Sequence, residues 1–175
     1  MVRSTAIEVL ARRLGLNVGR VAALAQRAAE SGALPKARGR DVPDLGPLDL
    51  ARLLLCAVAD RGLGSVPQSV RAYSSLAANN GAILVDVVEG WIRGTVPISG
   101  VGHLVVQIEP EPAATIMSHG GAHFDFGPER SRGAAARTVI VPGESLSAIC
   151  HEFRGVTPDS ADEMTAVGRL AAALN

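Results

Sequence analysis

The sequence predicts an α+β protein, in which a helical N-terminal half precedes a smaller half of mixed strands and helices. Apolar residues recur at helical spacing up to about residue 93, whereas beyond Gly94 they alternate along short segments, as in half-buried strands. The chain has 175 residues, of which 47% are apolar and 19% charged, so it has enough apolar residues to bury a core. These observations predict one compact domain or two small ones.

Five helices are expected in the first half, because apolar spacing coincides there with residues that begin or end helices. They span about residues 5–14, 18–31, 47–61, 67–78 and 83–93. Ser4 and Asn17 are expected to cap the first two helices, and Gly15 is expected to end the first.

The second half is expected to contain about four antiparallel strands and two C-terminal helices. The strands span about residues 103–110, 113–119, 122–126 and 137–143. Gly120 and Gly121 are expected to join the second and third strands in a tight hairpin. The helices cover residues 144–153 and the segment after Thr157. The last helix should face the core with Met164, Val167, Leu170 and Leu174.

The change from helical to alternating spacing places a boundary near residues 94–102. We therefore expect an N-terminal unit over residues 1–62, a helical connector over 63–94 and an α+β unit over 95–175.

Basic residues concentrate at the N-terminus, although the net charge is zero. The first 40 residues hold eight basic and two acidic side chains, whereas the remainder holds nine arginines and fifteen acidic residues. A basic surplus of this kind is typical of a surface that meets a polyanion. The structural alternative is that the arginines merely solvate exposed helices.

Residues 10–26, LARRLGLNVGRVAALAQ, have the pattern of two helices that cross at a sharp turn. Ala11 is small enough for the helix contact, Gly15 allows the backbone to reverse, and Val21 fills the corner. The remaining buried positions are occupied by Leu10, Leu14, Leu16 and Leu24. Residues 5–27 thus resemble the helix-turn-helix family of DNA-binding domains, although an ordinary helical hairpin can satisfy the same pattern.

The resemblance implies that the second helix enters the major groove of DNA. At this register it exposes Asn17, Gly19, Arg20, Ala23, Gln26 and Arg27. Arg20 could then recognise guanine, and Gln26 adenine, through bidentate hydrogen bonds. Arg12, Arg13 and Arg27 are better placed for phosphates, which position a protein without specifying sequence.

The segment PKARGR, residues 35–40, follows the second helix where winged helix-turn-helix proteins carry a basic hairpin. Lys36, Arg38 and Arg40 alternate and are therefore added to the predicted DNA contacts; a solvated linker is the alternative. The chain departs from the family in one respect, because only a few residues precede the motif. The helix at 47–61 would have to complete the core in place of the usual first helix.

Other constellations point to no catalytic or metal chemistry. His119 and His123 have no third ligand marked near them, and adjacent residues such as Cys150 and His151 face different directions on a helix. We therefore expect no enzyme, no metal and no cofactor. Cys56 and Cys150 lie in apolar segments and are expected to be buried, reduced thiols, which suits a cytoplasmic protein. We expect neither a signal peptide nor a membrane span.

The predicted function is sequence-specific binding of double-stranded DNA, with transcription regulation as the expected role. A small terminase subunit of a phage, which recognises DNA for packaging, is a close alternative. A protein-interaction adaptor, whose basic N-terminus meets an acidic protein, is a second hypothesis, and a metal-dependent enzyme that uses His119 and His123 is a third. Because DNA readers of this type gain affinity from repeated copies, we expect a homo-oligomer, preferably a dimer, assembled through residues 95–175.

Overall fold

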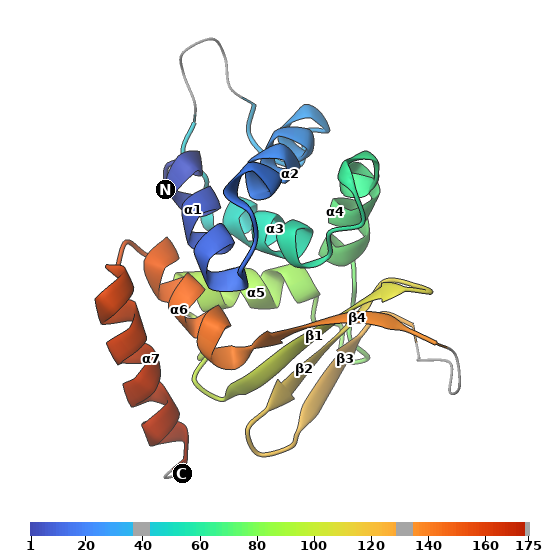
Figure 1. Cartoon of the computed structure of the whole chain (residues 1–175). Helices are drawn as coiled ribbons and strands as arrows, with labels where there is room; N and C mark the ends of the chain where they lie inside the picture. Colours follow the sequence, from blue (N-terminus) through green and yellow to red (C-terminus); the bar gives the residue numbers. More distant parts are fainter. Residues whose placement is uncertain (37–42, 129–134, 174–175) are drawn as a thin grey trace.

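The computed structural model describes residues 1–36, 43–128 and 135–173, and it confirms the α+β class (Figure 1). The N-terminal helices are α1 (Arg3–Leu14), α2 (Val18–Glu30), α3 (Pro47–Val58), a 3-10 turn (Leu63–Ser65), α4 (Val66–Ser74) and α5 (Leu84–Arg93). The strands are β1 (Val101–Glu109), β2 (Ala113–Ser118), β3 (His123–Phe126) and β4 (Arg137–Pro142). The chain then forms α6 (Gly143–Phe153) and α7 (Pro158–Ala173).

The strands form one antiparallel sheet in the order β3-β2-β1-β4, as the alternating segments predict. β1 is a central strand, in which Val105 lies opposite Thr115 on one side and Ile140 on the other. Its side chains Leu104 and Val106 are fully buried. β4 passes directly into α6 at Gly143, where a Cβ would overlap the carbonyl oxygen of Val101.

The helical half packs closely on the rest of the chain. Figure 1 shows α2 at the end of the molecule away from the sheet, and α5 lying between α3 and the strands. α1 packs against α6, so the first and last parts of the sequence are neighbours. One cluster of buried side chains includes Leu10 in α1, Leu54 in α3, Leu104 in β1 and Leu146 in α6. The hydrophobic core therefore continues across residues 62 and 94, where the sequence predicts boundaries.

Three helix ends differ from the predictions. α1 begins at Arg3 after Val2, and no side chain caps it, so the expected Ser4 cap is wrong. α3 ends at Val58, because the Asp60 carboxylate accepts a hydrogen bond from the Gly62 backbone and closes a turn there. α4 ends at Ser74, four residues early, because residues 77 and 78 leave the helix to form β-bridges with Ile83 and Phe126.

The face of α7 that contacts the protein is also opposite to the prediction. Met164, Val167 and Leu170 are 47%, 66% and 61% exposed, and Leu174 lies outside the described residues. Small side chains form the packed face instead. Ala161 is fully buried, and the Thr165 hydroxyl donates to Ser147 of α6 at 3.2 Å. Small residues allow two helices to approach closely, so the larger apolar side chains are left facing outward.

Both cysteines are buried and unpaired, as expected. Burial raises the pKa of the Cys56 and Cys150 thiols to about 12, which leaves them protonated and inert near neutral pH. Across the ranges that the structure describes, none of the helices is both long and apolar enough to span a membrane.

Candidate nucleic-acid interface

The turn between α1 and α2 is short, and the pattern residues Ala11, Gly15 and Val21 lie at or beside it. Gly15 adopts the left-handed conformation with φ 65°, and Leu16 N–H donates to the Ala11 carbonyl at 2.8 Å. Ala11 is 3% exposed at the helix contact, and Val21 is fully buried beyond the turn. The two helices therefore meet through the small and branched residues that the sequence marks for those positions.

Asn17 caps α2, as predicted, because its side-chain oxygen accepts from Arg20 N–H at 3.3 Å. A helix cap satisfies backbone donors that otherwise lack partners, so this side chain already has a structural role. Gly19, the next predicted contact, is exposed, and a Cβ there would lie 3.1 Å from the Asn17 oxygen. Glycine thus suits both the cap and a close approach of another molecule to the start of α2.

The outer face of α2, which we define as Gly19, Ala22, Ala23, Gln26 and Arg27, is exposed at Gly19, Gln26 and Arg27 and half-buried at Ala22 and Ala23. Gln26 and Arg27 both donate to the exposed Glu30 carboxylate, at 3.0 and 2.9 Å. These two hydrogen bonds lower the pKa of Glu30. Arg27 is thus partly neutralised, but by a partner one helical turn away and open to solvent.

Arg12 and Arg13, predicted to contact phosphates, are directed toward the C-terminal helices. Both pair with Glu152 of α6, which is only 3% exposed; the Arg13 Nε–Glu152 Oε1 distance is 2.6 Å. Arg13 also bonds Asp162 of α7 at 2.6 Å and donates to the Pro158 carbonyl at 3.2 Å. A buried carboxylate requires paired, hydrogen-bonding partners, so the two arginines stabilise Glu152 and attach α1 to α6 and α7.

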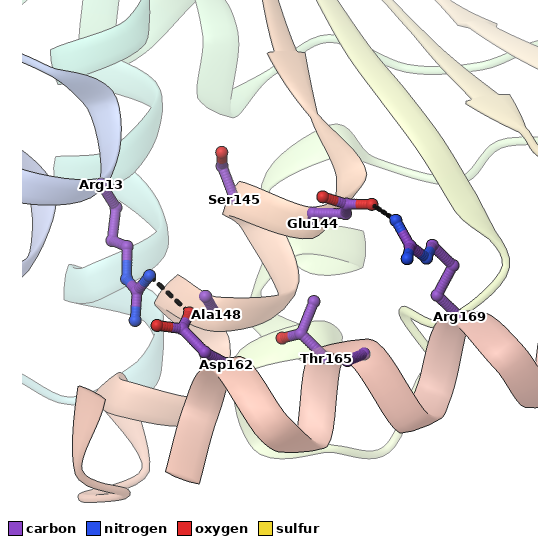
Figure 2. A pocket seen from close by; sticks show the side chains of 8 residues that line it. Arg13, Glu144, Ser145, Ala148, Asp162, Thr165 and Arg169 are labelled. Carbon is purple, nitrogen blue, oxygen red and sulfur yellow. Dashed lines mark hydrogen bonds and ion pairs between the residues drawn. The ribbon is translucent and has the colours of Figure 1, made fainter. Parts of the chain in front are cut away.

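Figure 2 shows this attachment beside a pocket of about 300 Å³ between α6 and α7. Arg13 reaches Asp162 at one end of the pocket, and Glu144 contacts Arg169 at 2.5 Å at the other end. Ion pairs at the two ends of the pocket therefore connect α7 to the rest of the protein, through Asp162 to α1 and through Arg169 to α6.

Arg20, predicted to read guanine, forms a two-pronged ion pair with Asp60 just beyond α3. Its Nε and Nη2 atoms lie 2.6 and 2.7 Å from the two carboxylate oxygens. The hydrogen bonds from Arg20 lower the pKa of Asp60. Because a bidentate pair occupies the fork of the guanidinium, Arg20 cannot present that fork to a base while the pair is intact.

The predicted basic hairpin is only partly described. Lys36 is exposed, and it makes no hydrogen bond or ion pair with any residue that the structure describes. Arg38 and Arg40 lie outside the described residues.

Part of the basic surplus of the N-terminus is thus matched inside the fold, by three carboxylates. The partners Asp60, Glu152 and Asp162 lie 40 to 149 residues along the chain from the arginines that they bind. A local count of charges cannot detect such pairs. The one signal in the sequence is the acidic surplus of the remaining chain, which is large enough to offset the basic head.

His119 and His123 lie near the turn of the β2–β3 hairpin. Ser118 N–H donates to the Ala122 carbonyl at 2.8 Å, and His123 lies opposite Met117. His123 lies 3.7 Å from Asp125, on its own strand. Within the described ranges, no three His, Cys, Asp or Glu side chains gather as a metal site would require.

Comparison of the chain with protein-family models, with curated proteins and with solved structures finds no match.

Proposed function

We propose that this chain binds double-stranded DNA in a sequence-specific manner and acts as a transcription regulator. The observation that carries the proposal is the α1–α2 turn, beside which α2 packs against α1 while Gln26 and Arg27 of α2 stay exposed. A helix held in this way can enter the major groove while its partner helix supports it.

The composition of the outer face of α2 supports this role. Gly19, Ala22 and Ala23 are small, so neither bulk nor charge prevents approach to base edges. The first turn of α2 contains no acidic residue, which leaves the positive end of the helix favourable for a phosphate. Gln26 can pair with adenine, and Arg27 with guanine or a phosphate.

Glu30 is a small obstacle to this interaction. Arg27 and Glu30 are 56% and 42% exposed, and ion pairs so open to solvent contribute little to stability. DNA can therefore replace Glu30 as the partner of Arg27 at little cost.

We assign a different role to the other predicted contacts. Arg12, Arg13 and Arg20 position α1 and α2 through Glu152, Asp162 and Asp60 and are not proposed to touch DNA. Few phosphate contacts then remain for each copy, so useful affinity requires two copies. The exposed row Met164, Val167 and Leu170 on α7 supports self-association through the C-terminal half.

Two other functions remain as alternatives. A small terminase subunit would assemble into a large ring, whereas the proposed regulator would be a dimer, so sedimentation analysis separates them. An adaptor for an acidic protein is favoured by the internal pairing of the basic head, because pairing lowers the positive potential that DNA would meet.

The proposal is tested by selecting duplexes from a random pool and measuring fluorescence anisotropy with the selected and a scrambled duplex. The double substitution Gln26→Ala and Arg27→Ala should abolish the preference for the selected duplex, at a cost of about tenfold or more in affinity. Arg93→Ala is the matched control, since Arg93 is also half exposed and pairs with Glu89 on its own helix.

Equal binding of both duplexes by the native protein would show a non-specific binder and contradict the proposal. If folded protein bound neither duplex, DNA binding would be rejected and the adaptor would become the leading function.

A further inference from the structure

Three of the five aromatic side chains of this protein gather around one cleft, which has a volume of about 370 Å³. Trp91 comes from α5, and Phe124 and Phe126 come from β3. In a chain with only 3% aromatic residues, this concentration distinguishes the cleft from three other cavities among the described residues, whose linings hold no aromatic side chain.

The cleft is built by α5 facing one side of the sheet. Val87 and Trp91 stand one turn apart on α5, so they share a face of that helix. Ile116 and Phe124 are direct cross-strand partners, and Phe126 follows on the same side of β3. The turn before α5 closes one edge, where Ala78 N–H donates to the Ala82 carbonyl at 2.8 Å.

The aromatic side chains differ in depth. Trp91 and Phe126 are 2% and 3% exposed and form the inner wall, whereas Phe124 is 53% exposed and stands at the mouth. A phenylalanine so open to water is an unusual use of one of the few aromatic residues, because burying an aromatic ring stabilises a fold more than almost any other burial. A molecule in the cleft would cover it.

The lining also restricts the charge of a ligand. None of the described residues around the cleft is ionisable, and Asn80 and Ser118 are the polar side chains among them. Asn80 accepts a hydrogen bond from Ala82 N–H at 3.1 Å through its oxygen, which leaves its amide nitrogen as a donor. An ionic ligand would lose its hydration here without gaining an opposite charge.

We propose that this cleft is a binding site for a small, uncharged aromatic molecule of one or two rings. Its volume lies at the lower end of the range for small-molecule sites, its walls offer ring faces and edges for stacking, and Asn80 offers one polar contact. The site does not depend on the proposed DNA binding, since none of its residues belongs to α1 or α2.

Trp91 is the single tryptophan of the protein, so its emission reports directly on the cleft. The probe is 7-amino-4-methylcoumarin, an uncharged two-ring aromatic amine that accepts energy from tryptophan. We expect saturable quenching of Trp91 with one site per chain. Ala82→Leu, which fills the cleft, should weaken probe binding about tenfold, whereas Ala77→Leu should not change it. Ala77 lies in the same turn but does not line the cleft.

A second variant, Phe124→Ala, keeps the proposal testable if Ala82→Leu does not fold. Because Phe124 is half exposed, Phe124→Ala should keep the fold, as circular dichroism will check, and should weaken binding about fivefold. Absence of saturable quenching in the folded protein, or equal affinity in all variants, would overturn the proposal. The proposal would also be overturned if sedimentation showed that the chain dimerises and a second copy, covering the cleft, excluded the probe. The assay contains no DNA, so its failure leaves the DNA-binding proposal intact.

Discussion

The arginines near the start of the chain divide into two groups that the sequence does not distinguish. Arg12, Arg13 and Arg20 pair with carboxylates from distant parts of the chain, and one of those carboxylates is buried. Arg27 instead pairs with Glu30 on its own helix, in full contact with solvent. The first group binds the helical head to the body of the protein, while the second remains available to a partner. The same residue type therefore has a structural use on one side of the motif and a proposed binding use on the other.

We expect the largest loss of stability when both arginine partners of Glu152 are removed, since these arginines belong to the structural group. Arg12→Ala with Arg13→Ala leaves a carboxylate that is 3% exposed without a cation, so we expect a loss of about 3 kcal/mol in the free energy of unfolding. Urea unfolding measures this loss. Adding Glu152→Met should restore much of the stability, because it removes the uncompensated charge. A loss under about 1 kcal/mol would show that these arginines do not anchor the head.

The α1–α2 turn, which sets the positions of both groups of arginines, depends on Gly15. Its φ of 65° is unfavourable for any residue with a Cβ, although nothing else crowds that position. Gly15→Ala should therefore cost about 1–2 kcal/mol in unfolding free energy through backbone strain alone. Gly64→Ala is the control, since Gly64 also has open space but no positive φ. Equal costs for the two substitutions would contradict this account of the turn.

The Arg20–Asp60 pair should stabilise the fold less than the pairs of Glu152 do, and in a pH-dependent way. The pKa of Asp60 is lower in the folded protein than its ordinary value of 3.8, so the unfolded chain binds the proton more readily. The contribution is then fully present above pH 3.8 and is lost as the pH falls through the folded pKa. Asp60→Asn should be less stable than the native protein at pH 6 and equally stable at the acid end. A difference that persists in acid would assign the effect to packing.

The smallest effect should come from Arg27. Because its pair with Glu30 is exposed and local, Arg27→Ala should leave the free energy of unfolding almost unchanged. Thermal and urea unfolding test this expectation. A larger loss would place Arg27 among the structural arginines and weaken the proposed role of the outer face of α2.

Local patterns in the sequence predict much of this fold. The roles of Ala11, Gly15 and Val21, the Asn17 cap and the four strands all follow from spacing within a few residues, and the structure confirms them. Features that depend on distant residues were not predictable in this way. The partners of Arg12, Arg13 and Arg20 are brought near only by the packing of α1 on α6 and by the turn after α3.

The orientation of α7 was the other feature that the sequence did not predict correctly. In α7 one face carries Met164, Val167 and Leu170, and the opposite face carries small residues. Hydrophobic spacing favours the larger side chains as the buried set. The face of α7 that packs against α6 is the one that allows the two helices to approach more closely. That close approach depends on the small side chain of Ala161 and on the hydrogen bond from the Thr165 hydroxyl to Ser147.

The salt dependence of binding to a selected duplex tests the division of the arginines most directly. The slope of log affinity against log salt counts the cations that meet phosphates, at about 0.9 per contact. The account predicts that Lys36→Ala or Arg27→Ala lowers affinity and makes the slope shallower by up to about one contact, while Arg20→Gln leaves the slope unchanged. If Arg20→Gln reduced the slope as much as Arg27→Ala, Arg20 would contact DNA and the division proposed here would be wrong.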